Sequence, residues 1–91
     1  MMKRETLMQK LSDKGVHVVG TTEDFYQGYR LEADMVKGIW ISAESTPQLF
    51  DYWSGKWANT FGVDPKLNTL VENSGWYFEW YDPGTMMIWP N

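Results

Sequence analysis

The sequence contains no cysteine and a single histidine. The absence of cysteine excludes disulfide bonds, thiol catalysis and cysteine-ligated zinc. The histidine, His17, stands in the valine-rich segment VHVVG, where a lone imidazole is far more often structural or exposed than catalytic. Only an all-oxygen metal site remains available, and the acidic residues do not follow the spacing of an EF-hand loop. We therefore expect neither a bound metal nor a cofactor.

Long apolar runs and a glycine-rich phosphate-binding loop are also missing. No segment approaches the roughly 20 apolar residues of a membrane span, and residues 1–15 have no apolar run typical of a signal peptide. The glycines lack the spacing of a phosphate loop, and no serine stands in a nucleophile-elbow motif. Glu79 has no identifiable second carboxylate for glycoside hydrolysis. These absences predict a non-enzymatic cytoplasmic protein that does not bind membranes.

The acidic balance of the chain argues against a nucleic-acid partner. The net charge is −4, and the basic residues concentrate in residues 1–14, so that the rest of the chain is more acidic than the total suggests. Phosphate binding needs clustered lysine and arginine, which the chain lacks outside that segment. A protein partner with a basic surface fits the charge better. Ordinary solubility of a small domain is the simpler explanation of this charge.

Aromatic residues are the unusual component, with six Trp, five Tyr and four Phe among 91 residues. Each ring buries about 150–250 Å² when it is covered. A single domain of this length, residues 1–91, hides only somewhat over ~60% of its unfolded surface. One small core therefore cannot cover every ring completely, and some rings are expected at least partly in contact with solvent.

Three segments have the pattern of amphipathic helices. Thr46 and Pro47 are typical of a helix start, as are Asp64 and Pro65 further along. The longest segment has an apolar stripe at helical spacing, expected to pack on a sheet rather than to bind a partner. That stripe consists of Leu49, Phe50, Trp53, Trp57 and Phe61. The predicted helices are residues 3–14, 45–62 and 64–74.

Alternating apolar and polar residues predict three strands in the first half of the chain. In FYQGYRLEAD, for example, Tyr29 and Leu31 point to one side while Arg30 and Glu32 point to the other. The residues between the second and third strands suit a hairpin connection. The predicted strands are residues 16–20, 25–34 and 38–44, with a loop at residues 21–24.

The last segments, GWYFEWYDPGT and MMIWP, predict a β-hairpin. A two-residue Pro-Gly turn is disfavoured because its twist would splay the strands, so we expect a four-residue loop. That loop pairs Tyr81 with Met86, Trp80 with Met87 and Phe78 with Trp89. One face then holds Trp76, Phe78, Trp80, Met87 and Trp89. The opposite face holds Tyr77, Glu79, Tyr81, Met86 and Ile88.

These elements predict an α+β fold with an antiparallel sheet of about five strands. The expected order is α-β-β-β-α-α-β-β, with the helices packed mainly on one face of the sheet. The tryptophan-rich face of the hairpin is expected to be core. The tyrosine face is too apolar for ordinary solvated sheet surface, so it is either covered by a helix, such as residues 3–14, or open for binding.

An open tyrosine face predicts a protein-binding module of the inhibitor, immunity or adaptor type, a class that phages and mobile elements often encode. The predicted binding residues are Tyr77, Glu79, Tyr81, Met86 and Ile88, and Glu79 would favour a cationic group of the partner. Homodimerisation through the same face is a variant of this hypothesis. The alternative is a small-ligand domain that binds carbohydrate through exposed aromatic rings.

Overall fold

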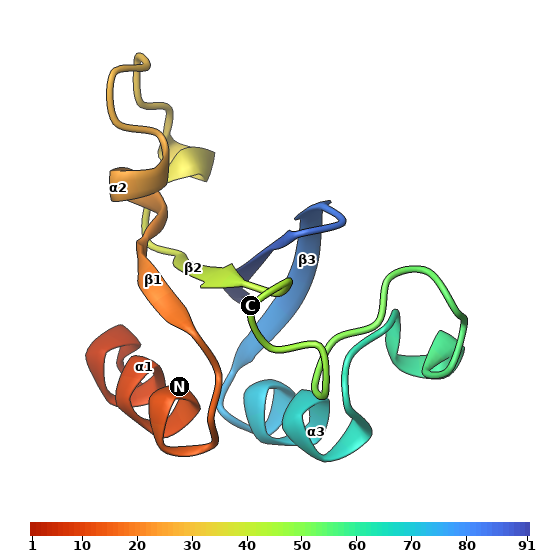
Figure 1. Cartoon of the computed structure of the whole chain (residues 1–91). Coiled ribbons are helices and arrows are strands. Elements are labelled where there is room, and N and C mark those ends of the chain that lie inside the picture. Colours follow the sequence, from red (N-terminus) through yellow and green to blue (C-terminus); the bar gives the residue numbers. More distant parts are fainter.

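A computed structural model describes residues 1–91 and shows a mixed α+β architecture built on one antiparallel sheet (Figure 1). Its four strands lie in the spatial order β1-β2-β4-β3. The α+β class is therefore confirmed, whereas the expected sheet of about five strands and the expected order of elements are not confirmed. The helices and strands are α1 Arg4–Asp13, β1 Val18–Thr21, α2 Thr22–Phe25, η1 Ala33–Met35, β2 Ile39–Ser42, η2 Ala58–Thr60, α3 Pro65–Asn73, β3 Trp76–Asp82 and β4 Thr85–Pro90.

Helices α1 and α3 form within the predicted ranges 3–14 and 64–74. In α1, Leu7 and Leu11 lie one turn apart and are fully buried. In α3, the Asp64 side chain accepts hydrogen bonds from the first free backbone N–H groups, and Pro65 occupies the first position of the helix. Its buried residues, Leu67 and Val71, are again one turn apart.

Both helices pack against the same face of the sheet, which we call the inner face (Figure 1). This face and the helices share one hydrophobic cluster. The cluster comprises Leu7, Leu11, Val16, Ile39, Ile41, Ala43, Phe50, Val63, Leu67, Val71, Trp76, Met86 and Ile88. The prediction that helices cover mainly one face describes α1 and α3, but not the short helix α2.

The strand predicted at residues 25–34 does not form. Thr21 and Asp24 close a capping box at the start of this stretch, so the chain enters the short helix α2 instead. Gly28 then adopts a φ of 94°, which interrupts any extended run. Because β1 pairs directly with β2, no sheet edge between them is left for these residues. They form an excursion that rises away from the sheet, in orange and yellow in Figure 1.

The helix predicted at residues 45–62 is also wrong. Backbone hydrogen bonds from Asp51 to Gly62 and from Asp64 to Leu49 close this stretch into a loop. Gly62 has a φ of 85°, and a Cβ there would lie 2.4 Å from the carbonyl oxygen of Asp51. Of the predicted apolar stripe, Phe50 is buried, but Trp53 and Phe61 are 80% and 82% exposed. The chain therefore forms a closed loop here instead of the predicted helix.

The C-terminal hairpin forms with a register one residue away from the predicted one. Asp82 pairs with Thr85 across a two-residue Pro-Gly turn, and the pairing shifts between Trp80 and Asp82. The extra residue on β3 is a bulge at Tyr81, which increases the local twist and so accommodates the short turn. The predicted four-residue loop is therefore wrong. The observed pairs include Trp80 with Met86, Glu79 with Met87, Phe78 with Ile88 and Tyr77 with Trp89.

This register exchanges the predicted places of the β4 side chains. Met86 and Ile88, predicted on the tyrosine face, are fully buried in the core. Met87 and Trp89, predicted in the core, lie on the tyrosine face, since neighbouring residues of a strand point to opposite sides. On β3 the predicted alternation is confirmed, because Trp76 is buried and Tyr77 is exposed.

Gly38 shows how closely the chain packs where the excursion rejoins β2. A Cβ at this position would lie 2.7 Å from the ring of Trp89 and 2.8 Å from Cγ2 of Thr22. Both neighbours are constrained, because Thr22 is fully buried and Trp89 belongs to β4. A glycine is therefore required for this close approach.

We expect Gly38→Ala to lower the free energy of unfolding by about 1–3 kcal/mol, the usual cost of overpacking a rigid site. Urea denaturation followed by tryptophan fluorescence measures the change. Gly84→Ala is the matched control, because its Cβ would meet only the flexible end of the exposed Glu44 side chain. Equal stability of the two variants would contradict the close packing at Gly38.

Candidate binding cleft on the outer face of the sheet

The face of the sheet opposite α1 and α3 carries a continuous set of large side chains. The register aligns Trp40 of β2 with Met87 of β4, and Met87 in turn with Glu79 of β3. Side chains in such a row point to the same side of the sheet. We call this surface the outer face, and it comprises Trp40, Tyr77, Glu79, Tyr81, Met87 and Trp89.

One end of the outer face is covered by helix α2. The Phe25 ring lies edge-on to Trp40 at a centroid distance of 5.0 Å and to Tyr81 at 4.7 Å. Tyr26 approaches the same tyrosine at 6.4 Å. Below these rings Met87 is only 1% exposed. The cover predicted from residues 3–14 is therefore wrong, since α1 packs on the inner face.

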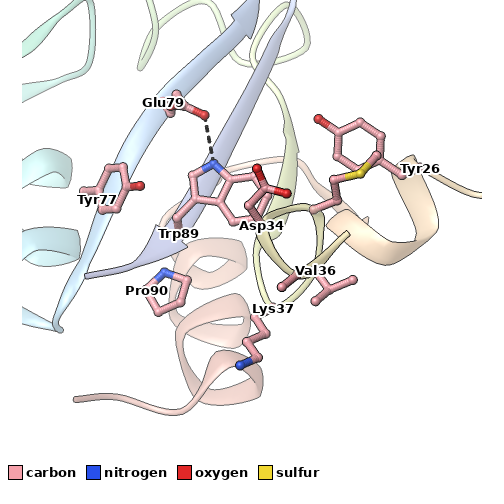
Figure 2. A pocket seen from close by; sticks show the side chains of 10 residues that line it. Tyr26, Asp34, Val36, Lys37, Tyr77, Glu79, Trp89 and Pro90 are labelled. Carbon is pink, nitrogen blue, oxygen red and sulfur yellow. Dashed lines mark hydrogen bonds between the residues drawn. The ribbon is translucent and has the colours of Figure 1, made fainter. Parts of the chain in front are cut away.

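The other end of the outer face forms one wall of a cleft of about 510 Å³. The opposite wall is the returning part of the excursion, around η1. Figure 2 shows the rings of Tyr77, Trp89 and Tyr26 around this space, with the Glu79 carboxylate above the indole. The lining residues are Tyr26, Ala33, Asp34, Met35, Val36, Lys37, Tyr77, Glu79, Trp89 and Pro90. The volume falls within the range of small-molecule and side-chain pockets.

The cleft holds two carboxylates without an ion-pair partner. The ion pairs of the structure join Arg4 to Glu23 and Arg30 to Glu32, so Asp34 and Glu79 take part in neither. Glu79 Oε1 accepts a hydrogen bond of 3.1 Å from the Trp89 indole N–H (Figure 2). This bond fixes the carboxylate beside the indole ring.

The position of Lys37 and the pKa of Tyr26 show how charge is distributed in the cleft. Lys37 is the one basic residue of the lining, and Figure 2 places its side chain at the end away from Glu79. Burial raises the pKa of the Tyr26 hydroxyl, and the neighbouring charges of Tyr81, Glu79 and Asp34 raise it further. The phenol therefore stays neutral, and the Glu79 and Asp34 carboxylates near it favour positive charge.

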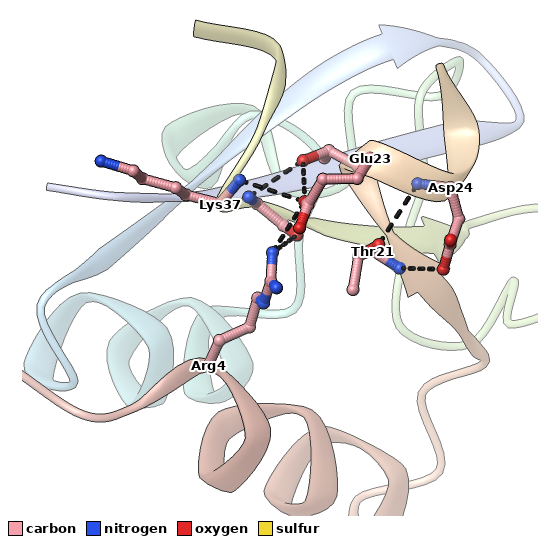
Figure 3. A network of polar contacts seen from close by, with 7 residues as sticks. Arg4, Thr21, Glu23, Asp24 and Lys37 are labelled. Carbon is pink, nitrogen blue, oxygen red and sulfur yellow. Dashed lines mark hydrogen bonds and ion pairs between the residues drawn. The ribbon is translucent and has the colours of Figure 1, made fainter. Parts of the chain in front are cut away.

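A polar network fixes both ends of the excursion that forms the second wall (Figure 3). Glu23 Oε1 accepts hydrogen bonds from Nη1 of Arg4 at 2.8 Å and from the backbone N–H of Lys37 at 3.1 Å. The buried Thr22 hydroxyl accepts from the backbone N–H of Gly38 at 2.9 Å. The Glu23 carboxylate thus joins helix α1 to the start and the end of the excursion. The hydrogen bonds that it accepts lower the pKa of Glu23 to about 2.

Three of the five predicted binding residues lie on the outer face. Tyr77 and Glu79 line the cleft, and Tyr81 lies next to it under the rings of α2. Met86 and Ile88 are excluded from any surface, because both are fully buried. Their prediction failed because the hairpin register was off by one residue.

Sequence reasoning missed the other residues of the cleft. The predicted register places Trp89 in the core, whereas the observed register places it opposite Tyr77. Tyr26 and Asp34 were assigned to a strand, and the capping-box spacing of Thr21 and Asp24 was the signal for a helix turn there.

A second group of exposed rings lies on the loop of residues 51–61, which we call the loop surface. Trp53 and Phe61 are its most exposed members. Tyr52 packs edge-on to Trp80 at 5.1 Å and to Trp53 at 5.0 Å, and the Trp80 indole N–H donates to the carbonyl oxygen of Phe61. Tyr52 is therefore held between two other rings and the backbone at Phe61 is tied to β3, whereas the Trp53 and Phe61 rings are largely exposed.

No cluster of three or more histidine or acidic side chains that could hold a metal ion is present. None of the helices has the length and apolar character needed to cross a bilayer. Comparisons with protein-family models, with curated proteins and with solved structures found no match. The outer face is therefore interpreted from its own geometry.

The hydrogen bonds of Glu23 make the free energy of unfolding depend on pH. The pKa of Glu23 is about 2 in the folded chain and 4.5 in the reference state, so its stabilisation is complete above pH 4.5 and is lost as the pH falls toward 2. The side chain is about one-third exposed, so solvent screening limits its contribution to about 1 kcal/mol.

We therefore expect Glu23→Gln to be less stable than the original chain by about 1 kcal/mol at pH 7, with the difference shrinking toward zero near pH 2. Urea unfolding at a series of pH values measures it. Glu44→Gln, at an exposed site outside the network, serves as control. A difference between Glu23→Gln and the original chain that does not change with pH would contradict the role assigned to this carboxylate.

Proposed function

We propose that the chain is a small, non-enzymatic protein-binding module of the cytoplasm, of the kind that acts as an inhibitor, an immunity protein or an adaptor. The observation that carries the proposal is the half-open outer face. Tyr77 and Tyr81 are 39% and 52% exposed, beside a cleft that contains the unpaired carboxylate of Glu79.

The side chains of this face have the properties of interface anchors. Tyrosine and tryptophan contribute a large contact area, lose little conformational entropy and are enriched among residues that dominate binding energy. Here they are positioned by a sheet and by ring contacts, so little ordering is needed when a partner binds. The carboxylates favour a partner with a basic surface.

We expect Tyr77→Ala to weaken partner binding about tenfold or more, because it removes a central anchor. The partner is captured from lysate of the native host by immobilised protein, identified by mass spectrometry and then titrated as a purified protein. Thermal unfolding of this variant should be nearly unchanged, since Tyr77 is exposed and is not part of the core cluster.

Trp53→Ala is the matched control, since it removes an even more exposed ring on the loop surface. It should leave the affinity of the captured partner unchanged. Loss of binding with Trp53→Ala but not with Tyr77→Ala would transfer the interface to the loop surface. A large fall in the melting temperature of Tyr77→Ala would show that this ring is structural. Light scattering after size-exclusion chromatography decides the homodimer variant, because a monomer at high concentration removes it.

The exposed indole of Trp53 favours a second candidate function, the binding of a carbohydrate. Planar rings stack on the apolar faces of sugars, and Tyr52 stands next to this indole at a centroid distance of 5.0 Å. We expect a sugar ligand to change the tryptophan fluorescence of the original chain but not that of Trp53→Ala. A flat response across a panel of glycans would remove this candidate.

A further inference from the structure

We propose that the cleft binds the side chain of an arginine, presented by the protein partner. The inference deepens the proposed function, because it names the group that the outer face recognises. Three features carry it: the aromatic walls, the two unpaired carboxylates, and the position of the single lysine. Each of them selects among the groups that a protein partner can present.

The walls of the cleft suit a planar cation. Tyr26, Tyr77 and Trp89 contribute rings from three different segments of the chain, and Figure 2 shows them around one space. Guanidinium groups stack on aromatic faces and bind there through the ring quadrupole. The methylene groups of an arginine side chain lie well against such apolar surface. A carboxylate or phosphate would gain nothing from these walls.

The carboxylates supply acceptors for the fork of N–H groups. Glu79 uses Oε1 to accept from the Trp89 indole N–H, and no protein group donates to Oε2. Asp34 lines the same cleft and has no ion-pair partner. Arginine presents five N–H donors in one plane, so it can reach a carboxylate oxygen while its plane stacks on a ring. An ammonium group lacks this planar match.

Lys37 orients the ligand. Its side chain lies at the end of the cleft away from Glu79 (Figure 2), so repulsion directs an entering cation toward the carboxylates. The Tyr26 hydroxyl, which stays neutral and keeps its O–H free to donate a hydrogen bond, completes the polar rim at the opposite end. The cleft is therefore polarised along its length.

The aromatic wall is fixed by close packing, and the second wall is anchored at its ends. Gly38 lies directly against the Trp89 ring, which prevents the ring from shifting toward β2. The second wall begins and ends at the hydrogen bonds of Glu23 and Thr22 (Figure 3). A preformed site loses less entropy on binding and separates similar ligands better than a flexible one.

The test is a titration of the ¹⁵N-labelled full chain with acetyl-arginine amide, followed by NMR. The indole N–H of Trp89 is the local probe, because it donates to the carboxylate that the ligand would contact. We expect a saturable shift of this resonance in the millimolar range of the probe. The indole resonances of Trp53 and Trp57, outside the cleft, should not move.

Two comparisons define the specificity. Acetyl-citrulline amide, which has the same shape without the charge, should cause no saturable shift, and acetyl-lysine amide should bind several-fold more weakly. Glu79→Gln should weaken binding of the arginine probe about tenfold. Glu44→Gln changes the net charge equally at an exposed site outside the cleft, and it should bind the probe like the original chain.

Three results would overturn the inference: no saturable shift of Trp89, citrulline binding as well as arginine, or equal losses for Glu79→Gln and Glu44→Gln. Its failure is distinguishable from failure of the proposed function. If the probe does not bind but Tyr77→Ala still loses the captured partner, the protein-binding function stands without arginine recognition. If the probe binds in the cleft and Tyr77→Ala retains the partner, the cleft recognises arginine but is not the interface of that partner.

Discussion

The pairing of β3 with β4 is the constraint on which the other features of this structure depend. The short turn and the bulge at Tyr81 fix which residue of one strand faces which residue of the other. Because side chains alternate along a strand, this single choice sends Met86 and Ile88 into the core and Trp89 to the outer face. A shift of one residue would exchange the two sets, and both the core and the candidate cleft would be lost.

The cleft exists because the outer face is covered at one end only. Helix α2 places Phe25 over Trp40 and Tyr81, but the chain then leaves the sheet and returns at Gly38. The return is fixed by the carboxylate of Glu23, to which both α1 and the backbone at the end of the excursion donate hydrogen bonds. The hydrogen bonds of Glu23 thus link the packing on the inner face to the shape of the outer face.

Local sequence signals predict α1, α3 and the sorting of side chains along β3. The Asp64 cap and the Pro65 start predict α3, the amphipathic pattern of residues 3–14 predicts α1, and the alternation along β3 sorts its side chains correctly. The helix expected at residues 45–62 and the hairpin register fail because distant partners decide their conformation, whereas the turn α2 was missed although its capping box is a local signal. The stripe from Leu49 to Phe61 has helical spacing, yet hydrogen bonds across the loop ends outweigh it. The hairpin register depends on a bulge that no residue type predicts. The predicted positions of Met86, Ile88 and Trp89 were wrong for this reason.

Cross-strand nuclear Overhauser contacts measure the β3–β4 register directly. We expect backbone proton contacts between Glu79 and Met87 and between Phe78 and Ile88, with Met87 also in contact with Trp40 of β2. Contacts that instead pair Met87 with Trp80 would contradict this register. They would place Met87 on the inner face and remove the outer face as described.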